Sequence, residues 1–135
     1  MSPRPEVCVG AVAVDDGKIL LVRRGRGAGQ GLWSVPGGRV EPGETLPAAV
    51  QRELAEETAV AGECGQLLGV AERIGREYHF VILDYLVSVV PGQRAVAGDD
   101  AFAAAWVTFE ELARLDASGE LVPGLLAFLR EHGVL

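Results

Sequence analysis

The chain has 135 residues, of which 49% are hydrophobic, and its formal net charge is −7 at pH 7. This length suits one domain with a buried core, so we expect residues 1–135 to form a single domain. The negative charge excludes a general nucleic-acid binder, which normally presents a basic face. It does not exclude a small phosphorylated substrate, because bound cations and a few arginines can reverse the field inside one cleft.

The first residues and the cysteines bear on location in the cell. No apolar run is long enough to span a membrane, and residues 1–5 (MSPRP) lack the hydrophobic region of a signal peptide. Cys8 and Cys64 are far apart, which favours two buried, reduced thiols over a disulfide framework. We therefore expect a cytoplasmic protein that binds neither a membrane nor nucleic acid.

The first predicted elements form a β-hairpin. Residues 7–14 (VCVGAVAV) are mostly apolar and predict a strand that is covered on both faces. Residues 15–17 (DDG) indicate a turn, after which residues 18–23 (KILLVR) return as the partner strand. Residues 25–31 (GRGAGQG) lack the spacing of a P-loop and predict a mobile loop that borders the site. Trp33 follows, and packing in the core is its default interpretation over stacking on a base.

A helix is predicted next, from Leu46 to about Thr58, with Thr45 as its N-cap. At about 100° per residue, Leu46, Val50 and Leu54 lie on one narrow stripe of this helix. Such a stripe normally faces the core of the protein. The opposite face carries small and uncharged residues, whereas an ordinary surface helix would place its acidic residues there.

The acidic residues of this helix share the direction of the apolar stripe. Glu53 and Glu57 lie in nearly the same direction as the stripe, and Glu56 lies just beside it. Three crowded carboxylates repel one another and lose hydration unless a strong positive charge lies among them. A hard divalent cation with oxygen ligands, Mg²⁺ or Mn²⁺, is the natural candidate. The alternative is a solvated acidic face.

The spacing of these residues resembles the Nudix box of the Nudix (MutT-like) hydrolases. That box has a glycine, five residues, a glutamate, seven residues, Arg-Glu-aliphatic, one residue, Glu-Glu, one residue, then glycine and an aliphatic residue. The positions that match it here are Gly38, Glu44, Arg52, Glu53, Leu54, Glu56, Glu57 and Val60. Ala59 departs from the pattern, since the family has glycine there. The box covers residues 38–60, and Trp33 to Gly38 resembles the usual approach to it.

Strands are predicted after the box. Residues 65–74 and 78–90 have β-like composition, with a turn at residues 75–76. A glycine at position 59 would end the helix in the left-handed conformation, where alanine costs about 1 kcal/mol more. One resolution is that the helix runs slightly longer and Gly62 takes over the capping role.

The last third of the chain predicts a loop, a strand and two helices. Residues 91–100 are polar, and residues 103–107 predict a short strand. Residues 108–115 begin with a capping box and predict a helix. Pro123 in a first helical turn and Gly133 just past the end bracket a C-terminal helix. This order of elements indicates a mixed α/β (α+β) fold, and the resemblance implies an α/β/α sandwich around a mixed β-sheet.

The resemblance also implies a chemistry, the hydrolysis of a phosphoric anhydride bond with Mg²⁺ or Mn²⁺. Divalent cations neutralise the phosphoryl groups, orient the pyrophosphate and lower the pKa of a bound water. The metal ligands implied by the family are the Gly37 carbonyl and the carboxylates of Glu53, Glu56 and Glu57. Arg52 would orient Glu53, and Glu44 would support the loop or bind metal more weakly.

The general base is less defined, because the family takes it from the box in some members and from a distant loop in others. We favour Glu53, with Asp99 or Asp100 as the alternative base. For Asp99 and Asp100 the competing interpretation is a solvated turn.

Candidate substrate contacts lie outside the box. Arg23, Arg24 and Arg73 are candidates for phosphate contacts, although surface solvation is the simpler interpretation of each one alone. Tyr78 and Phe80 share one face of a strand and could line a base pocket, with core packing as the alternative. His79 between them is interpreted as a half-buried structural histidine.

The substrate is where alternatives remain open. The strand HFVILDYLV and the later GDDAFAAAWV are similar to bacterial Nudix ADP-ribose or nucleotide pyrophosphatases. The resemblance thus implies a nucleoside diphosphate-linked substrate such as ADP-ribose, with a (deoxy)nucleoside triphosphate pyrophosphohydrolase as the alternative. A catalytically silent Nudix domain that binds a nucleotide or a protein is a third hypothesis. Dimers are common in the family, so a homodimer is also implied, but the sequence does not determine it.

Overall fold

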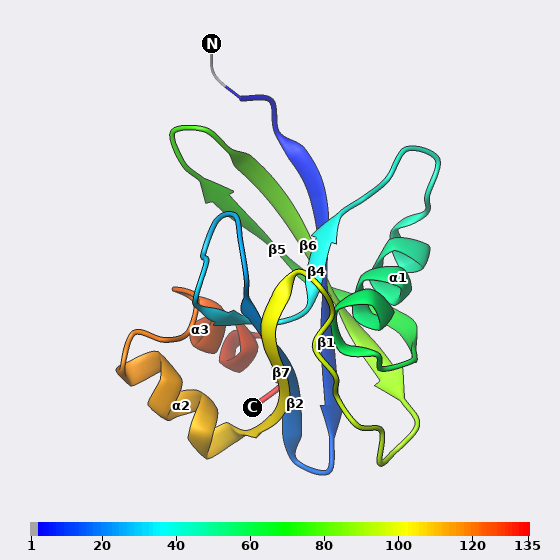
Figure 1. Cartoon of the computed structure of the whole chain (residues 1–135), viewed down its shortest axis with the longest axis vertical. Coiled ribbons are helices and arrows are strands. Elements are labelled where there is room, and N and C mark those ends of the chain that lie inside the picture. Colours follow the sequence, from blue (N-terminus) through cyan, green and yellow to red (C-terminus); the bar gives the residue numbers. More distant parts are fainter. Residues whose placement is uncertain (1–2) are drawn as a thin grey trace.

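The computed structural model describes residues 3–135, and within them seven strands form one mixed sheet (Figure 1). The strands are β1 (Glu6–Asp15), β2 (Lys18–Arg24), β3 (Trp33–Ser34), β4 (Gly37–Arg39), β5 (Gly62–Ile74), β6 (His79–Val89) and β7 (Ala101–Thr108). Their order is β3-β2-β1-β6-β5, while β4 also pairs with β1 and β7 with β2. The β1–β6 pair is parallel and the other pairs are antiparallel.

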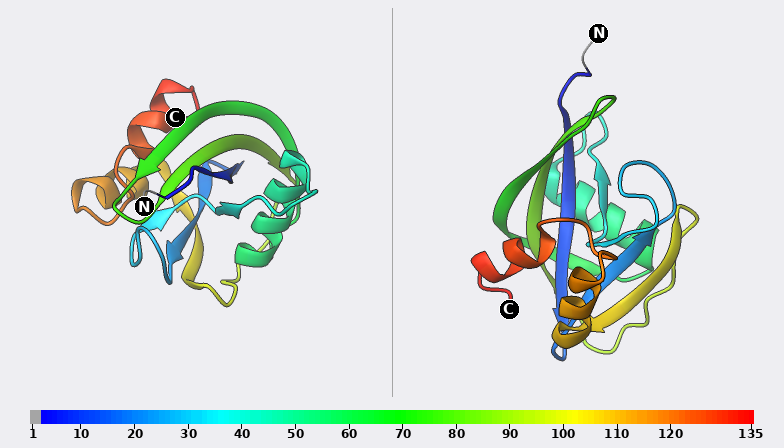
Figure 2. Two further views of the ribbon diagram at one scale, coloured as in Figure 1. Left: turned by 90° about the horizontal axis from the view of Figure 1, so that it is seen from above. Right: turned by 90° about the vertical axis from the view of Figure 1, so that its left-hand side faces the viewer.

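Helices cover both faces of this sheet, and the alternation of side chains along the strands sorts the core into two clusters. In β2, Leu20 packs toward α1 (Leu46–Thr58), while Ile19 and Leu21 pack on the opposite side. That opposite side is covered by α2 (Phe109–Ala117) and α3 (Leu125–Glu131). Figure 2 shows the sheet between α1 and the α2–α3 pair. The predicted α/β/α sandwich around a mixed sheet is confirmed.

The N-terminal hairpin forms as the sequence predicts. Asp15 and Lys18 are cross-strand partners, and the two residues between them have positive φ, 51° at Asp16 and 73° at Gly17. Two consecutive residues with positive φ are what a tight turn between antiparallel strands requires. Residues 8–13 of β1 are buried, because β2 and β6 flank this strand and helices cover both of its faces.

The helix α1 has the predicted bounds and the predicted N-cap. The Thr45 hydroxyl accepts a hydrogen bond from the Ala48 N–H, and Val50 and Leu54 are fully buried. The prediction that Gly62 caps the helix is wrong, since Gly62 already belongs to β5. Ala59 itself adopts the left-handed conformation, with φ 61°, and donates its N–H to the Ala55 carbonyl. The helix therefore ends at Thr58, and β5 begins at Gly62.

Two details of the C-terminal part differ from the prediction. The capping box of Thr108 and Glu111 is present, but α2 continues to Ala117. Pro123 lies before the helix α3 and not in its first turn, because Gly124, with φ 85°, is the N-cap. None of the helices within residues 3–135 has the length and apolar character needed to cross a membrane.

The cysteines are both free thiols, as predicted, but they differ in burial. Cys8 is buried in β1, whereas Cys64 near the start of β5 is only half-buried. The prediction of two buried thiols is therefore right for Cys8 alone.

Candidate active site

The guanidinium of Arg52 is the centre of a network of acidic side chains on α1 and on the loop that precedes it. Its Nε and Nη2 donate to the two carboxylate oxygens of Glu44, at 2.6 and 2.8 Å. Its Nη1 donates to Glu53 Oε1 at 2.8 Å and to Glu56 Oε2 at 3.2 Å. The hydrogen bonds from Arg52 lower the pKa of Glu44 to about 2. Glu44 also accepts the Glu41 N–H, so this carboxylate ties the loop to the helix.

Glu53 points inward, as the helical periodicity predicts. Its side chain is only 13% exposed, and its carboxylate lies against the backbone of Gly38. A Cβ atom on Gly38 would lie 2.6 Å from both carboxylate oxygens, so only glycine leaves room for them. Burial raises the pKa of Glu53, and the hydrogen bond from Arg52 partly offsets this rise. The ionised form of Glu53 is therefore kept at a free-energy cost.

Glu57 also faces the β4 strand. Its Oε2 accepts the N–H of Gly37 at 2.7 Å. Burial raises the pKa of Glu57 to about 7, and the charge of Glu53 adds to this rise, while the Gly37 N–H opposes it. Glu53 and Glu57 thus form a pair of neighbouring acids that pack against Gly38 and Gly37 of β4.

Glu56 lies differently from the prediction. Its side chain is 59% exposed, so the expectation that it faces inward is wrong. Three residues correspond to about 300° of helix rotation, which places Glu56 about 60° to one side of Glu53. This direction leads to the rim of the helix face, where Glu56 reaches Arg52 and solvent.

The chemistry of this acidic cluster fits a divalent cation. Within residues 3–135, no three acidic, histidine or cysteine side chains converge closely enough to hold a metal in this arrangement. The available donors are hard carboxylate oxygens, which Mg²⁺ and Mn²⁺ prefer. Burial raises the pKa values of Glu53 and Glu57, so a nearby cation would offset the cost of burying their charges. Rotation of the exposed Glu56 side chain would bring a third carboxylate to them.

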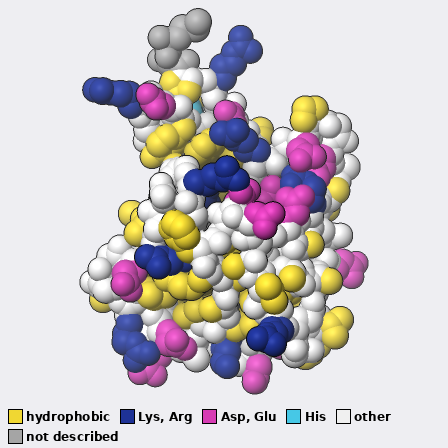
Figure 3. Space-filling model, in the orientation of Figure 1, with side chains coloured by type: hydrophobic (Ala, Val, Ile, Leu, Met, Phe, Trp, Pro, Cys, Tyr) yellow, Lys and Arg dark blue, Asp and Glu magenta, His cyan; other side chains and the backbone are white. Residues whose placement is uncertain are grey.

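A cleft of about 630 Å³ lies beside β4, and the carboxylates of Glu53, Glu56 and Glu57 do not line it. Its wall includes Gly37 and Gly38, so the backbone that contacts the acids also borders the cleft. Residues 27–29 of the glycine-rich loop form another part of the wall, as predicted for a loop that borders the site. Figure 3 shows acidic side chains gathered around basic ones in one area of the surface.

Several predicted substrate contacts meet in this cleft. Arg24 and Arg73 line it, together with Tyr78 and Phe80, whose rings stack with centroids 5.2 Å apart. Arg23 does not line it, because its Nε donates to the Gly31 carbonyl and its guanidinium lies over the Phe102 ring. The charge of Arg23 is therefore directed away from the cleft.

The two adjacent candidate bases outside the box differ in their relation to the cleft. Asp100 lines the cleft but forms an ion pair with Arg26 at its exposed rim. Asp99 is exposed and does not line the cleft. His79 lies at hydrogen-bond distance from Glu72, 3.1 Å, in agreement with a structural histidine.

Asp84 and Arg39 also line the cleft and were not predicted from the sequence. Asp84 of β6 is only 6% exposed, and burial raises its pKa to about 6. The sequence signal for Asp84 is an acidic residue inside an apolar run. Asp84 follows Phe80 by four residues and Ile82 by two, so the three side chains share one face of the strand. Arg39 also lines the cleft, with its guanidinium 5.8 Å from the centroid of the Phe80 ring.

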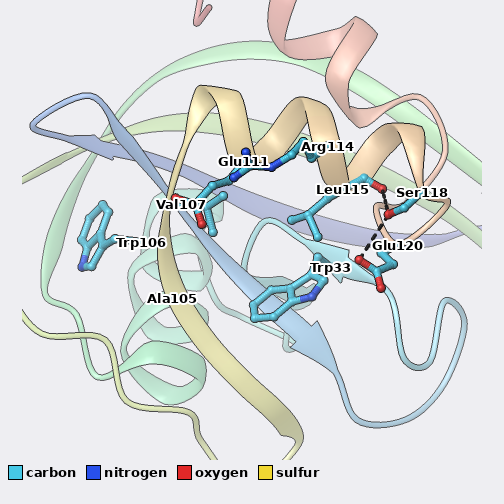
Figure 4. A pocket seen from close by; sticks show the side chains of 9 residues that line it. All are labelled: Trp33, Ala105, Trp106, Val107, Glu111, Arg114, Leu115, Ser118 and Glu120. Atoms are coloured by element: carbon cyan, nitrogen blue, oxygen red, sulfur yellow. Dashed lines mark hydrogen bonds between the residues drawn. The ribbon is translucent and has the colours of Figure 1, made fainter.

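A smaller hollow of about 420 Å³ lies between β7 and α2 (Figure 4). Trp33 and Leu115 border it, and Glu111, whose carboxylate completes the α2 capping box, lies at its edge. None of the residues that line this hollow belongs to the Nudix box. The larger cleft is therefore the better candidate for the active site.

Comparison with known proteins agrees with this assignment. A family model described as a NUDIX domain matches residues 4–128. An ADP-ribose pyrophosphatase from Methanocaldococcus jannaschii is 36% identical over 113 residues, which are 82% of this chain and 66% of the relative. The 8-oxo-dGDP phosphatase NUDT18 from Homo sapiens is 34% identical over 106 residues, 76% of this chain and 33% of that protein.

A solved structure extends the match to the whole fold. The crystal structure of a MutT NUDIX hydrolase from Burkholderia pseudomallei has a TM-score of 0.80 and 32% identity, covering 95% of this chain and 98% of that one. The chain spans about two thirds of the archaeal relative and about one third of the human one. The activities named for these two relatives are therefore those of longer proteins, of which this chain matches only a part.

Proposed function

Since the chain belongs to the Nudix family of hydrolases, we propose that it cleaves the pyrophosphate bond of a nucleoside diphosphate-linked substrate such as ADP-ribose, in a Mg²⁺- or Mn²⁺-dependent reaction. We further propose that residues 1–135 make up one Nudix domain. The observation that carries the proposal is the placement of Glu53 and Glu57 against Gly38 and Gly37, whose backbone also borders the 630 Å³ cleft. The identity with an archaeal ADP-ribose pyrophosphatase supports this substrate class.

In this proposal, Glu53, Glu56, Glu57 and the Gly37 carbonyl would hold the metal. When bound, Mg²⁺ would neutralise the pyrophosphate oxygens and activate water for attack on phosphorus. Arg52 does not line the cleft. It holds Glu53 through a 2.8 Å hydrogen bond and anchors the preceding loop through Glu44, so its role is to position the acids.

The chain's own residues then divide the remaining work. Glu53 is the proposed general base, because its carboxylate lies against the backbone of Gly38, which lines the cleft. Arg24 and Arg73 would contact phosphate oxygens from the cleft wall. The stacked rings of Tyr78 and Phe80 would form an apolar surface for the nucleobase of the substrate.

A (deoxy)nucleoside triphosphate or diphosphate is the second candidate substrate. The human relative named an 8-oxo-dGDP phosphatase is 34% identical, close to the value for the archaeal ADP-ribose enzyme. A catalytically silent domain is disfavoured, because Glu44, Arg52, Glu53, Glu56 and Glu57 of the box are all present.

The experiment is a hydrolysis assay with and without Mg²⁺ on ADP-ribose, diadenosine polyphosphates, and ordinary and oxidised dNTPs. We expect release of a nucleoside monophosphate that stops on chelation of the metal. Glu53→Gln and Glu57→Gln should each abolish this release while thermal unfolding stays cooperative. Glu110→Gln, on exposed α2 surface, is the matched control and should keep full activity. Full activity in both Glu53→Gln and Glu57→Gln would refute the proposal.

A further inference from the structure

Asp84 is a buried acid that the proposed hydrolysis does not use. It lies in β6 with only 6% of its surface exposed. Its Oδ1 is fully buried and has no hydrogen-bond partner within residues 3–135. The charge of Arg73 acts to lower the pKa of Asp84, but no ion pair joins the two side chains among the described residues. Buried polar groups normally have partners, so an orphaned carboxylate oxygen calls for an explanation.

Glycines flank Asp84 on both neighbouring strands. Its cross-strand partners are Gly10 in β1 and Gly69 in β5, so neither neighbour has a side chain. A Cβ on Gly10 would lie 2.0 Å from Asp84 Oδ1, which shows that the carboxylate occupies the room left by this glycine. The room left by Gly69 is filled by the rings of His132 and Phe128, and no described residue donates a hydrogen bond to the Asp84 carboxylate.

The same carboxylate borders the cleft at the end of an apolar wall. Phe80, Ile82 and Asp84 alternate along β6, and all three line the cleft. Phe80 stacks on Tyr78, so this wall begins with aromatic rings and ends with an acceptor oxygen. A flat, apolar ligand that carries an N–H group at its edge would match this arrangement.

We propose that Asp84 selects substrates whose base carries an exocyclic amino group, by accepting a hydrogen bond from that group at Oδ2, the carboxylate oxygen that is not packed against Gly10. This inference rests on the proposed function and names the part of the substrate that the cleft distinguishes. Adenine and cytosine carry such a donor, whereas hypoxanthine and uracil present a carbonyl oxygen at the equivalent position. A carbonyl oxygen facing the carboxylate leaves two acceptors together without a donor, which a buried site rejects strongly.

The test compares matched pairs of amino and oxo substrates. For ADP-ribose and inosine diphosphate ribose, and for CTP and UTP, kcat/KM should favour the amino member by about tenfold or more. In Asp84→Asn this preference should fall to about one or reverse, because the asparagine amide can donate to a carbonyl oxygen. The isosteric change Asp116→Asn, on the exposed face of α2, should keep the wild-type ratio.

A binding measurement separates this inference from the proposed function. Calorimetry with AMP and IMP should show the same preference without any hydrolysis. If the wild type hydrolyses amino and oxo substrates equally, or if folded Asp84→Asn keeps the preference, the role of Asp84 is overturned and the hydrolase stands. If no substrate is hydrolysed, the proposed function fails, and equal affinities for AMP and IMP would then overturn the role of Asp84. Should Asp84→Asn fail to unfold cooperatively, the wild-type ratios alone decide.

Discussion

The carboxylate of Glu53 occupies the space that a side chain on Gly38 would take. A Cβ atom at position 38 would lie 2.6 Å from the Cδ and from both oxygens of Glu53. The glycine of the box is thus required by an acid on the neighbouring helix, and its own backbone does not have positive φ.

Gly38→Ala should therefore abolish or strongly reduce hydrolysis while leaving the fold intact. The added methyl group meets the end of a flexible side chain, so Glu53 can turn away at little cost in stability, but its carboxylate leaves the site. Initial rates and thermal unfolding of the variant check this expectation. Gly17→Ala provides the contrast, because the Gly17 φ of 73° strains alanine in a hairpin with nothing within 4 Å. It should lower stability and leave activity unchanged.

Arg52→Lys should impair catalysis although the charge is kept. Arg52 donates to Glu44, Glu53, Glu56 and the Arg39 carbonyl at once, and a single ammonium group cannot replace this fork of donors. We expect activity to fall about 10- to 100-fold, the usual effect of losing a residue that orients metal ligands. The Mg²⁺ concentration for half-maximal rate should rise as well.

The matched control for this substitution is Arg114→Lys. Arg114 forms only an exposed pair with Glu110 on α2, at 3.6 Å. Its replacement should leave the rate and the Mg²⁺ dependence unchanged, since such exposed pairs contribute little. An Arg52→Lys enzyme with wild-type rates at every Mg²⁺ concentration would contradict the positioning role.

Ala59→Gly should stabilise the protein. Ala59 has φ 61° at the C-cap of α1, where the Cβ atom is unfavourable and glycine is not. The expected gain in the free energy of unfolding is about 1 kcal/mol, measured by urea denaturation. Ala55→Gly in the exposed interior of the same helix should instead lose about 1 kcal/mol. A loss of stability in Ala59→Gly would show that the methyl group has a packing role.

The pH dependence of stability should report on Asp84. Burial raises its pKa from 3.8 to about 6, so the folded state favours the protonated acid. Ionised Asp84 therefore lowers the free energy of unfolding, by an amount that grows as the pH rises from about 4 to about 6. Above about pH 6 the full loss of stability applies. At about 1.4 kcal/mol per pKa unit, this cost is about 3 kcal/mol.

Asp84→Asn removes the buried charge, and it should be more stable than the wild type at neutral pH. The difference should shrink toward zero near about pH 4, where Asp84 is protonated in the folded wild type. Urea denaturation of both proteins across this range measures it. Asp116→Asn, at an exposed position, should change stability little at any pH. If Asp84→Asn is less stable than the wild type at neutral pH, the carboxylate has an unrecognised structural donor.

The acids of α1 were largely predictable because their placement is a property of one helix. The periodicity of 46–58 and the fixed spacing of the box determine that Glu53 and Glu57 share the buried side, and both lie there. Glu56 lies about 60° to one side of Glu53. Whether that direction is buried depends on what packs beside the helix, and nothing in the helix itself gives this.

By itself, the sequence determined the helix, the hairpin and the local order of the box residues, because these follow from interactions between residues close in the chain. Tertiary structure alone decided which distant groups meet. The pairing of β6 with β1 and β5 sets Asp84 between Gly10 and Gly69, and the return of the chain to β5 forces Ala59 into the left-handed conformation. Burial and unmet hydrogen bonds arise from strands far apart in sequence, so their cost is visible only once the sheet is assembled.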